Sequence, residues 1–265
     1  MALLRIWLPC RKNGSPRKYG TGLNVSLQTG QKLIQKKTTN DLADCLEQLR
    51  WIFAGYKAGG LLDWKHGDRN SQDEVQPASA SQTEGKLSRI AGELTGCTRC
   101  RLHSGRSILV FGEGSAQSGL VFVGEGPGFD EDRQGRPFVG RAGKLLDKMI
   151  FAIGLERREV YICNVVKCRP PDNRAPQPDE TAACSPFLFR QIEALGPKVI
   201  CALGMSAAQA LIGSPRPISQ LRGKVLHWRG IPLICTYHPA YLLRSPSQKA
   251  AAWQDLKEVI RLLRA

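Results

Sequence analysis

The sequence predicts an α/β fold in which a mostly parallel sheet is covered by helices on both faces. Four short, β-branched apolar runs are typical of buried strands: Leu120–Val123, Val160–Val166, Val199–Leu203 and Ile231–Cys235. Stretches with apolar residues at helical spacing separate these runs. Strands that alternate with helices along a chain form a mostly parallel sheet between two helical layers.

Three helices are predicted between and after these strands. Apolar residues from Ala142 to Ile153 form one helical face, which Gly154 closes. Pro178 suits the first turn of a second helix, which stops at Gly196. A last helix is expected at about residues 248–263.

Composition and charge narrow the class of protein. Hydrophobic residues make up 42% of the 265 residues and charged residues 23%, which excludes a wholly disordered or fibrous chain. No apolar run approaches the ~18–20 residues of a membrane-spanning helix, so no membrane partner is expected. The formal net charge of +15 points to a polyanionic partner, most commonly nucleic acid.

The pattern divides the chain into four pieces. Residues 1–38 carry eight Lys or Arg and no acid, which favours a disordered basic arm or an over-extended start over a targeting segment. Residues 39–65 contain an amphipathic helix at about Asn40–Ala54. Residues 66–86 form a polar linker, and residues 87–265 form the globular domain.

Nine cysteines and no convincing secretory signal favour a reducing, cytoplasmic location. Cys97 and Cys100 form a C-x-x-C pair, and Cys168 and Cys184 flank a proline-rich loop near a strand end. Four thiolates brought together suit zinc or a [4Fe–4S] cluster, although a C-x-x-C pair alone suits redox chemistry. Three further cysteines lie inside apolar strands and are expected in the core: Cys163, Cys201 and Cys235.

A glycine-rich loop, Gly124–Asp132 (GEGPGFDED), follows the first strand directly. Its spacing is G-x-G-x-G and three acids follow, so it does not fit a dinucleotide fingerprint. Backbone donors beside carboxylates suit an uncharged polar ring next to a developing cation, while the simpler alternative is a tight turn.

The segment His238–Arg244 (HPAYLLR) follows the last strand, where open α/β sheets place their sites. Leu242, Leu243 and Arg244 form an apolar and basic protrusion that suits a wedge into a base stack. The alternative is the first turn of a buried helix.

Four segments together resemble the four-cysteine, iron–sulfur uracil-DNA glycosylases, called family 4. They occur in the family's order, and the resemblance spans about residues 87–263: GEGPGFDED, GRPFVGRAG (Gly135–Gly143), NVVKCRPPDNRAP (Asn164–Pro176) and HPAYLLR. The resemblance implies a three-layer α/β/α sandwich and a [4Fe–4S] cluster held by Cys97, Cys100, Cys168 and Cys184. It also implies excision of uracil from DNA, with uracil-containing DNA as the partner of a monomeric enzyme.

The resemblance assigns roles to individual residues. Phe138 would stack on a flipped uracil, Asn164 would read its edge, and the backbone around Gly126 would contact the base. Glu125 would crowd the 5-position, and His238 would donate to O2. Glu131 would orient or activate the water, and Asp130 and Asp132 are neighbours that could be confused with it.

Two other functions fit parts of the pattern. One is a metal-stapled nucleic-acid-binding module without catalysis, and the other is an iron–sulfur electron carrier. The second would need an electron partner, and no flavin or nicotinamide signature is present. The short loop Arg169–Pro178 lacks a histidine, so ordinary turnover is expected rather than covalent capture of DNA.

Overall fold

A computed structural model describes residues 79–265. The basic arm at 1–38, the helix expected at Asn40–Ala54 and most of the linker expected at 66–86 lie outside these residues. Among the described residues, no helix is both long and apolar enough to cross a lipid bilayer.

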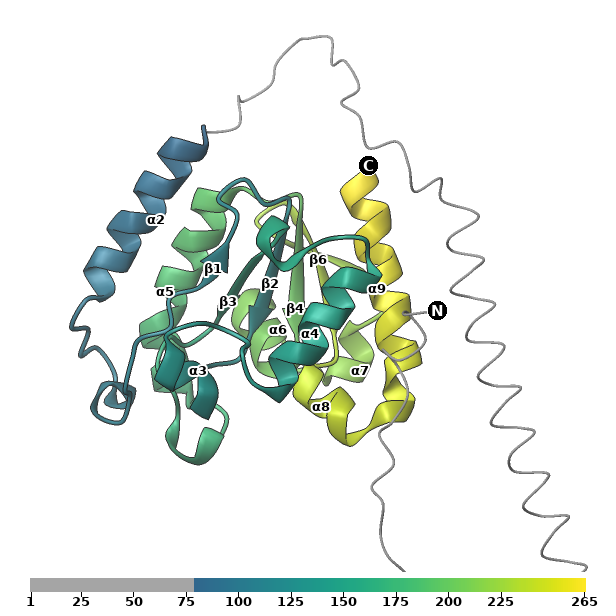
Figure 1. The fold of residues 1–265 in the computed structure, drawn as a ribbon. Helices are drawn as coiled ribbons and strands as arrows, with labels where there is room; N and C mark the ends of the chain where they lie inside the picture. The colour runs from purple at the N-terminus through teal and green to yellow at the C-terminus, as the bar shows by residue number, and fades with distance from the viewer. Residues whose placement is uncertain (1–78) are drawn as a thin grey trace, which may run out of the picture. The chain divides into compact units, whose positions relative to one another are not determined.

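Six strands form one sheet in the order β1-β3-β2-β4-β6-β5 (Figure 1). The four central strands are parallel and match the four predicted runs closely: β3 (Tyr161–Asn164), β2 (Leu120–Gly124), β4 (Val199–Leu203) and β6 (Ile231–Thr236). Each edge strand runs antiparallel to its neighbour, and neither was predicted: β1 (Glu113–Gly114) and β5 (Val225–Trp228).

Helices cover both faces of the sheet, so the predicted three-layer sandwich is confirmed. One face packs against α5 (Pro178–Leu195), α6 (Met205–Ile212) and α7 (Ile218–Leu221). The other packs against α4 (Arg141–Ala152), α8 (Pro239–Arg244) and α9 (Lys249–Arg264). The remaining short helices lie in the connections: η2 (Arg101–Ser104), α3 (Phe129–Gln134), η3 (Arg157–Glu159), η4 (Pro171–Asn173) and η5 (Pro246–Gln248).

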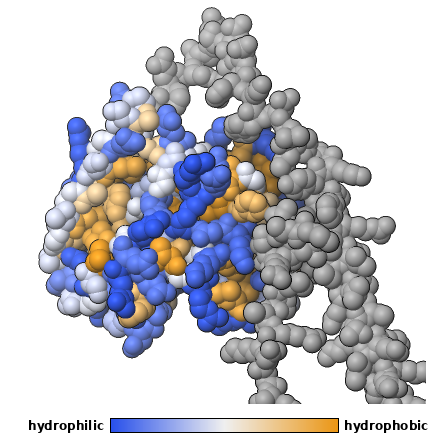
Figure 2. Space-filling model, in the orientation of Figure 1, coloured by the Kyte–Doolittle hydropathy of each residue, from blue (hydrophilic) through white to orange (hydrophobic). Residues whose placement is uncertain are grey.

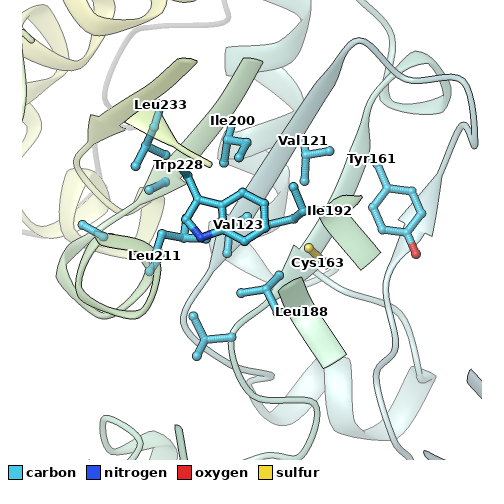
Figure 3. Packing of buried hydrophobic residues seen from close by; sticks show 14 of the residues in the cluster. Val121, Val123, Tyr161, Cys163, Leu188, Ile192, Ile200, Leu211, Trp228 and Leu233 are labelled. Carbon is cyan, nitrogen blue, oxygen red and sulfur yellow. The ribbon is translucent and has the colours of Figure 1, made fainter. Parts of the chain in front are cut away.

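Alternation along the central strands divides the core into two layers. In β2, Val121 and Val123 pack on the α5 side, and Leu120 and Phe122 pack on the α4 side. Figure 3 shows the first of these layers, with Trp228 lying among aliphatic side chains of several strands and helices. Three strand cysteines are buried in these layers, as expected: Cys163, Cys201 and Cys235.

The prediction of a linker as far as residue 86 is wrong, because α2 spans Ala80–Leu94. Ser79 caps this helix: its hydroxyl accepts from the Gln82 N–H, and the Gln82 side chain accepts from the Ser79 N–H. The helix is polar over most of its surface and buries one narrow stripe, and it packs against α5. That stripe begins with Thr83, which reads as polar in the sequence.

Candidate functional site

The candidate site lies at the carboxyl ends of the central strands. Gly124 ends β2 and pairs in register with Asn164, which ends β3. His238 follows β6 after one intervening residue and caps the N-terminus of α8. Because these strands are parallel, their ends meet at one edge of the sheet, and residues far apart in the sequence come together there.

Asn164 and Phe138 meet over Gly124. A Cβ atom added to Gly124 would lie 2.4 Å from Asn164 Oδ1 and 2.5 Å from Phe138 Cζ, so only glycine allows both side chains this close. Asn164 is 2% exposed, and its Oδ1 accepts no hydrogen bond from residues 79–265. A buried acceptor without a donor costs about 1–3 kcal/mol, and a donor on a bound ligand would remove this cost.

The backbone of Phe138 is in the left-handed region, with φ 51°, which is unfavourable for a bulky residue. Two residues, Arg157 and Glu131, hold this part of the backbone. Arg157 donates to the carbonyl oxygens of Pro137 and Phe138, and the carboxylate of Glu131 accepts from the N–H groups of Val139 and Gly140. The backbone that carries the Phe138 ring is therefore held by hydrogen bonds on both sides of this residue in the sequence.

His238 lies close to this ring, with 5.6 Å between the two ring centroids. Its Nδ1 accepts a hydrogen bond of 3.1 Å from the Ala240 N–H, so the proton of the neutral imidazole is on Nε2. Burial, with a smaller contribution from the Arg244 charge, lowers the pKa of His238 to about 4. At neutral pH the ring is an uncharged Nε2–H donor.

The three acids after the glycine-rich loop have different surroundings. Glu131 accepts from a third N–H group, that of Gly128, at 3.1 Å. Asp132 is buried, and both of its carboxylate oxygens accept from the Ser107 N–H. Its carboxylate is therefore not accessible to water from the solvent. Asp130 is exposed, and its carboxylate lies beside Gly140. Glu131 thus braces the Phe138 loop, and Asp130 is the acid with a free approach to solvent.

Glu125 and Gly126 lie in the glycine-rich loop that precedes these acids. Ser206, in the first turn of α6, donates to the carboxylate of Glu125 and orients it. A Cβ atom on Gly126 would lie 2.7 Å from Val166 Cγ2, so the loop backbone packs directly on the segment after β3. Sequence analysis missed Ser206 and Arg157, because each acts on a residue distant in the sequence and no local motif marks it.

Within the segment His238–Arg244, residues Pro239–Arg244 form the short helix α8, and this corrects part of the wedge prediction. Leu242 is 1% exposed and packs into the core beside α4 and α9, so it cannot enter a base stack in this conformation. Leu243 is 37% exposed, and Arg244 is also exposed. The helical turn directs neighbouring residues to different faces, which separates two leucines that the sequence presents as one patch.

The four predicted metal-ligating cysteines line one small cavity. Cys97 and Cys100 follow α2, Cys168 follows β3, and Cys184 lies on α5. Across residues 79–265 no three His, Cys, Asp or Glu side chains are grouped as ligands for a single metal ion.

Basic side chains line part of this cavity, and none of its lining residues is acidic. Arg99 donates to Cys97 Sγ at 3.3 Å, and Arg106 donates to Cys168 Sγ at 3.3 Å. Burial opposes ionisation of Cys97, but the hydrogen bonds and charges of these arginines hold the pKa of its thiol below the ordinary value. Lys167 also lines the cavity, although it is fully buried. Thiols beside positively charged groups are a donor set that fits a metal group of net negative charge.

Comparison with known proteins gives a consistent result. The sequence model of the uracil DNA glycosylase superfamily matches residues 111–257. A type-4 uracil-DNA glycosylase of Thermotoga maritima is 52% identical over 155 residues, which are 58% of this chain and 81% of the relative. One of Archaeoglobus fulgidus is 44% identical over 181 residues, 65% of this chain and 91% of the relative.

A more distant relative, a type-5 uracil-DNA glycosylase of Pyrobaculum aerophilum, is 33% identical over 175 residues, 59% of this chain and 75% of the relative. The matched region contains the ends of β2, β3 and β6, with the loops that carry Phe138, Asn164 and His238. The chain belongs to the uracil-DNA glycosylase superfamily and, within it, to the type-4 family.

Proposed function

We propose that the protein excises uracil from DNA by hydrolysing the bond between the base and deoxyribose, which leaves an abasic site. The observation that carries this proposal is the buried, unpaired Oδ1 of Asn164 beside the Phe138 ring and the His238 imidazole. A base inside a duplex cannot reach such a site, so the nucleotide is flipped out or taken from a single strand.

Base recognition follows from the Asn164 amide. Its Oδ1 accepts from uracil N3–H, and its Nδ2 donates to O4. Cytosine presents the opposite pattern and would leave both groups unpaired, so it is refused. Phe138 stacks on the flipped ring, the backbone at Gly126 contacts its edge, and Glu125 disfavours a 5-methyl group.

The bond-breaking step leaves negative charge on the base and positive charge on the sugar. The Nε2–H of His238 donates to uracil O2 as the negative charge develops there. Because the imidazole is neutral and already oriented, little reorganisation accompanies the reaction, and one such donor is worth about 3–4 kcal/mol. Glu131, or its exposed neighbour Asp130, holds the water that attacks the sugar and stabilises the developing cation.

We assign a [4Fe–4S] cluster to Cys97, Cys100, Cys168 and Cys184. The shared cavity and its cationic lining support this assignment. When bound, the cluster would link three chain segments as a structural cross-link. The residues that hold it join the end of α2 to α5 and to the segment after Asn164, and so they brace one wall of the base site.

The partner is uracil-containing DNA, and we propose that one chain acts alone, in the cytoplasm. A metal-stapled binding module without catalysis would bind the same DNA but leave it intact. The decisive experiment is incubation of anaerobically purified protein with matched oligonucleotides that contain uracil, thymine or cytosine at one position, followed by alkali cleavage. Strand cleavage only at uracil supports the proposal, and binding without cleavage supports the alternative.

Two variants separate the candidates for handling the water. Asp130→Asn preserves shape and removes none of the hydrogen bonds that hold the Phe138 loop, whereas Glu131→Gln weakens the contacts to Gly128, Val139 and Gly140. If Glu131 acts on the water, its variant loses single-turnover rate and Asp130→Asn does not. The reverse result transfers this role to Asp130 and leaves Glu131 as a brace.

A further inference from the structure

An exposed aromatic ring lies at the start of α3, directly after the glycine-rich loop. Phe129 is 51% exposed, and it belongs to none of the apolar clusters formed by the described residues. The guanidinium of Arg133 lies over its ring at 5.5 Å from the centroid, and that of Arg169 lies at 5.1 Å. The three side chains form a cluster of planar groups, which we call the Phe129 platform.

The platform is basic despite its acidic neighbours. The carboxylates of Glu131 and Asp132 accept hydrogen bonds from backbone N–H groups. Asp130 is therefore the exposed acid of this helix. Arg169 is oriented by a hydrogen bond of 2.8 Å from its Nε to Asn173 Oδ1. Two guanidinium groups beside an exposed ring suit a ligand that offers both a π face and negative charge.

The platform lies at the rim of the base site. Phe129 begins the helix that follows the glycine-rich loop, and Arg169 follows Asn164 by five residues in the sequence. The two segments are in contact, because a Cβ atom on Gly126 would lie 3.7 Å from Pro170 Cδ. Figure 1 shows α3 and α8 at the same end of the sheet, so the platform and the exposed Leu243 both lie at the end that holds the site.

The surface around this rim suits nucleic acid rather than an apolar partner. Figure 2 shows a face that is mostly hydrophilic, with separate apolar patches rather than one continuous apolar surface. Unpaired DNA bases stack on aromatic rings and on guanidinium planes, and the phosphates beside each base interact with the arginine charges.

We propose that the Phe129 platform binds an unpaired DNA base next to the flipped uracil in the same strand, with Arg133 and Arg169 contacting the flanking phosphates. This inference rests on the proposed function, since it assumes that the uracil of the same DNA strand is bound at Asn164. It predicts that the protein binds single-stranded DNA through stacking as well as charge.

The test uses Phe129→Ala, with Phe151→Ala as a matched control. Phe151 is 58% exposed and lies near the end of α4, at the opposite end of the sheet from the site. Binding of the full chain to a uracil-free, fluorescein-labelled single-stranded oligonucleotide is measured by anisotropy. Phe129→Ala is expected to weaken binding about 5- to 100-fold, Phe151→Ala to leave it unchanged, and Phe129→Trp to restore it.

Salt dependence tests the arginine contribution. Arg133→Gln is expected to reduce the slope of log affinity against log salt by about 0.7, the value for one phosphate contact on a single strand. Equal binding by the parent and Phe129→Ala, or equal losses in both Phe→Ala variants, overturns the platform. Failure of the parent to excise uracil would refute the proposed function but not the binding comparison, which uses DNA without uracil.

Discussion

The ammonium group of Lys167 donates a hydrogen bond of 2.8 Å to the backbone carbonyl of Asn164, and another of 2.5 Å to Gln191 Oε1. Lys167 is 0% exposed, and burial lowers its pKa. The residue joins the end of β3, which carries the base-reading amide, to the wall of the cysteine cavity. The base site and the cavity therefore share one buried side chain.

Lys167→Met should loosen Asn164 and destabilise the fold. The substitution leaves two buried acceptors without their donor, and we expect a loss of about 2–4 kcal/mol in the free energy of unfolding. Lys198→Met is the control, since Lys198 is exposed and its hydrogen bond to the Leu263 carbonyl is long, at 3.5 Å. Chemical denaturation measures both variants; similar stabilities would contradict a bracing role for Lys167.

Asn164→Asp should change which base is accepted. A carboxylate would oppose uracil O4, whereas a protonated carboxyl could pair with cytosine. We expect uracil excision to fall on the order of 100-fold or more, with any residual activity shifted toward cytosine. Single-turnover assays on both bases measure this, after circular dichroism has verified the fold. Parent-like activity on uracil would refute the assignment of Asn164.

His238 should contribute to catalysis as a neutral donor. His238→Ala is expected to slow the chemical step about 100- to 1000-fold without changing base choice, and His238→Gln to recover part of the rate. Since its pKa is about 4 in the folded protein, the excision rate should show no inflection from His238 near pH 6.5. A full rate in His238→Ala would exclude the donor role.

The same pKa predicts how His238 affects stability. The unfolded imidazole takes up its proton near pH 6.5, and the folded one does so only near pH 4. The stabilising contribution is therefore complete above about pH 6.5 and is lost as the pH falls toward 4. Unfolding free energy should drop more between pH 7 and pH 5 in the parent than in His238→Gln, and equal drops would contradict the lowered pKa.

Cysteine replacements should separate cluster ligands from core residues. Cys168→Ala removes a proposed ligand and should abolish bound iron and acid-labile sulfide, with a large loss of thermal stability. Cys163 is fully buried in β3, so Cys163→Ala should cost only about 1 kcal/mol and keep the iron. Iron and sulfide analysis with thermal unfolding measures both. Iron retained in Cys168→Ala would contradict the ligand set.

The two leucines of α8 should have opposite phenotypes. Leu243→Ala should reduce excision from duplex DNA more than from single strands, because only the duplex has to be opened, and should barely change stability. Leu242→Ala should destabilise the fold by about 2–5 kcal/mol, because it empties a core position. Equal losses on both DNA forms in Leu243→Ala would argue against a wedge.

Most of the fold could be predicted from the sequence because the central strands are buried on both faces. Such strands appear as continuous β-branched runs, and all four runs coincide with observed strands to within a few residues. The edge strands could not be found in this way. β1 has two residues and no pattern, and β5 is only partly buried, so its stabilising contacts come from its partner.

Site residues could be predicted only where a local sequence pattern marks them. Asn164 and Cys168 were expected at the end of one strand and Cys184 on the helix that follows, and the structure places them there. Arg157 and Ser206 act through space on loops elsewhere in the sequence, and so their roles depended on the tertiary structure. Lys167 did carry a signal, since a lysine directly after an apolar strand run needs hydrogen-bond partners if it is buried.

The two antiparallel edge strands have a consequence for behaviour at high concentration. A parallel sheet with open sides presents unpaired N–H and C=O groups to which strands of other molecules can add. Here β1 is only two residues long and includes Gly114, where an added Cβ would lie 1.9 Å from the Val160 carbonyl oxygen. On the other side, β5 is short and carries the exposed, polar His227. Both borders are poor templates for strand addition, which protects the aggregation-prone central strands from intermolecular pairing.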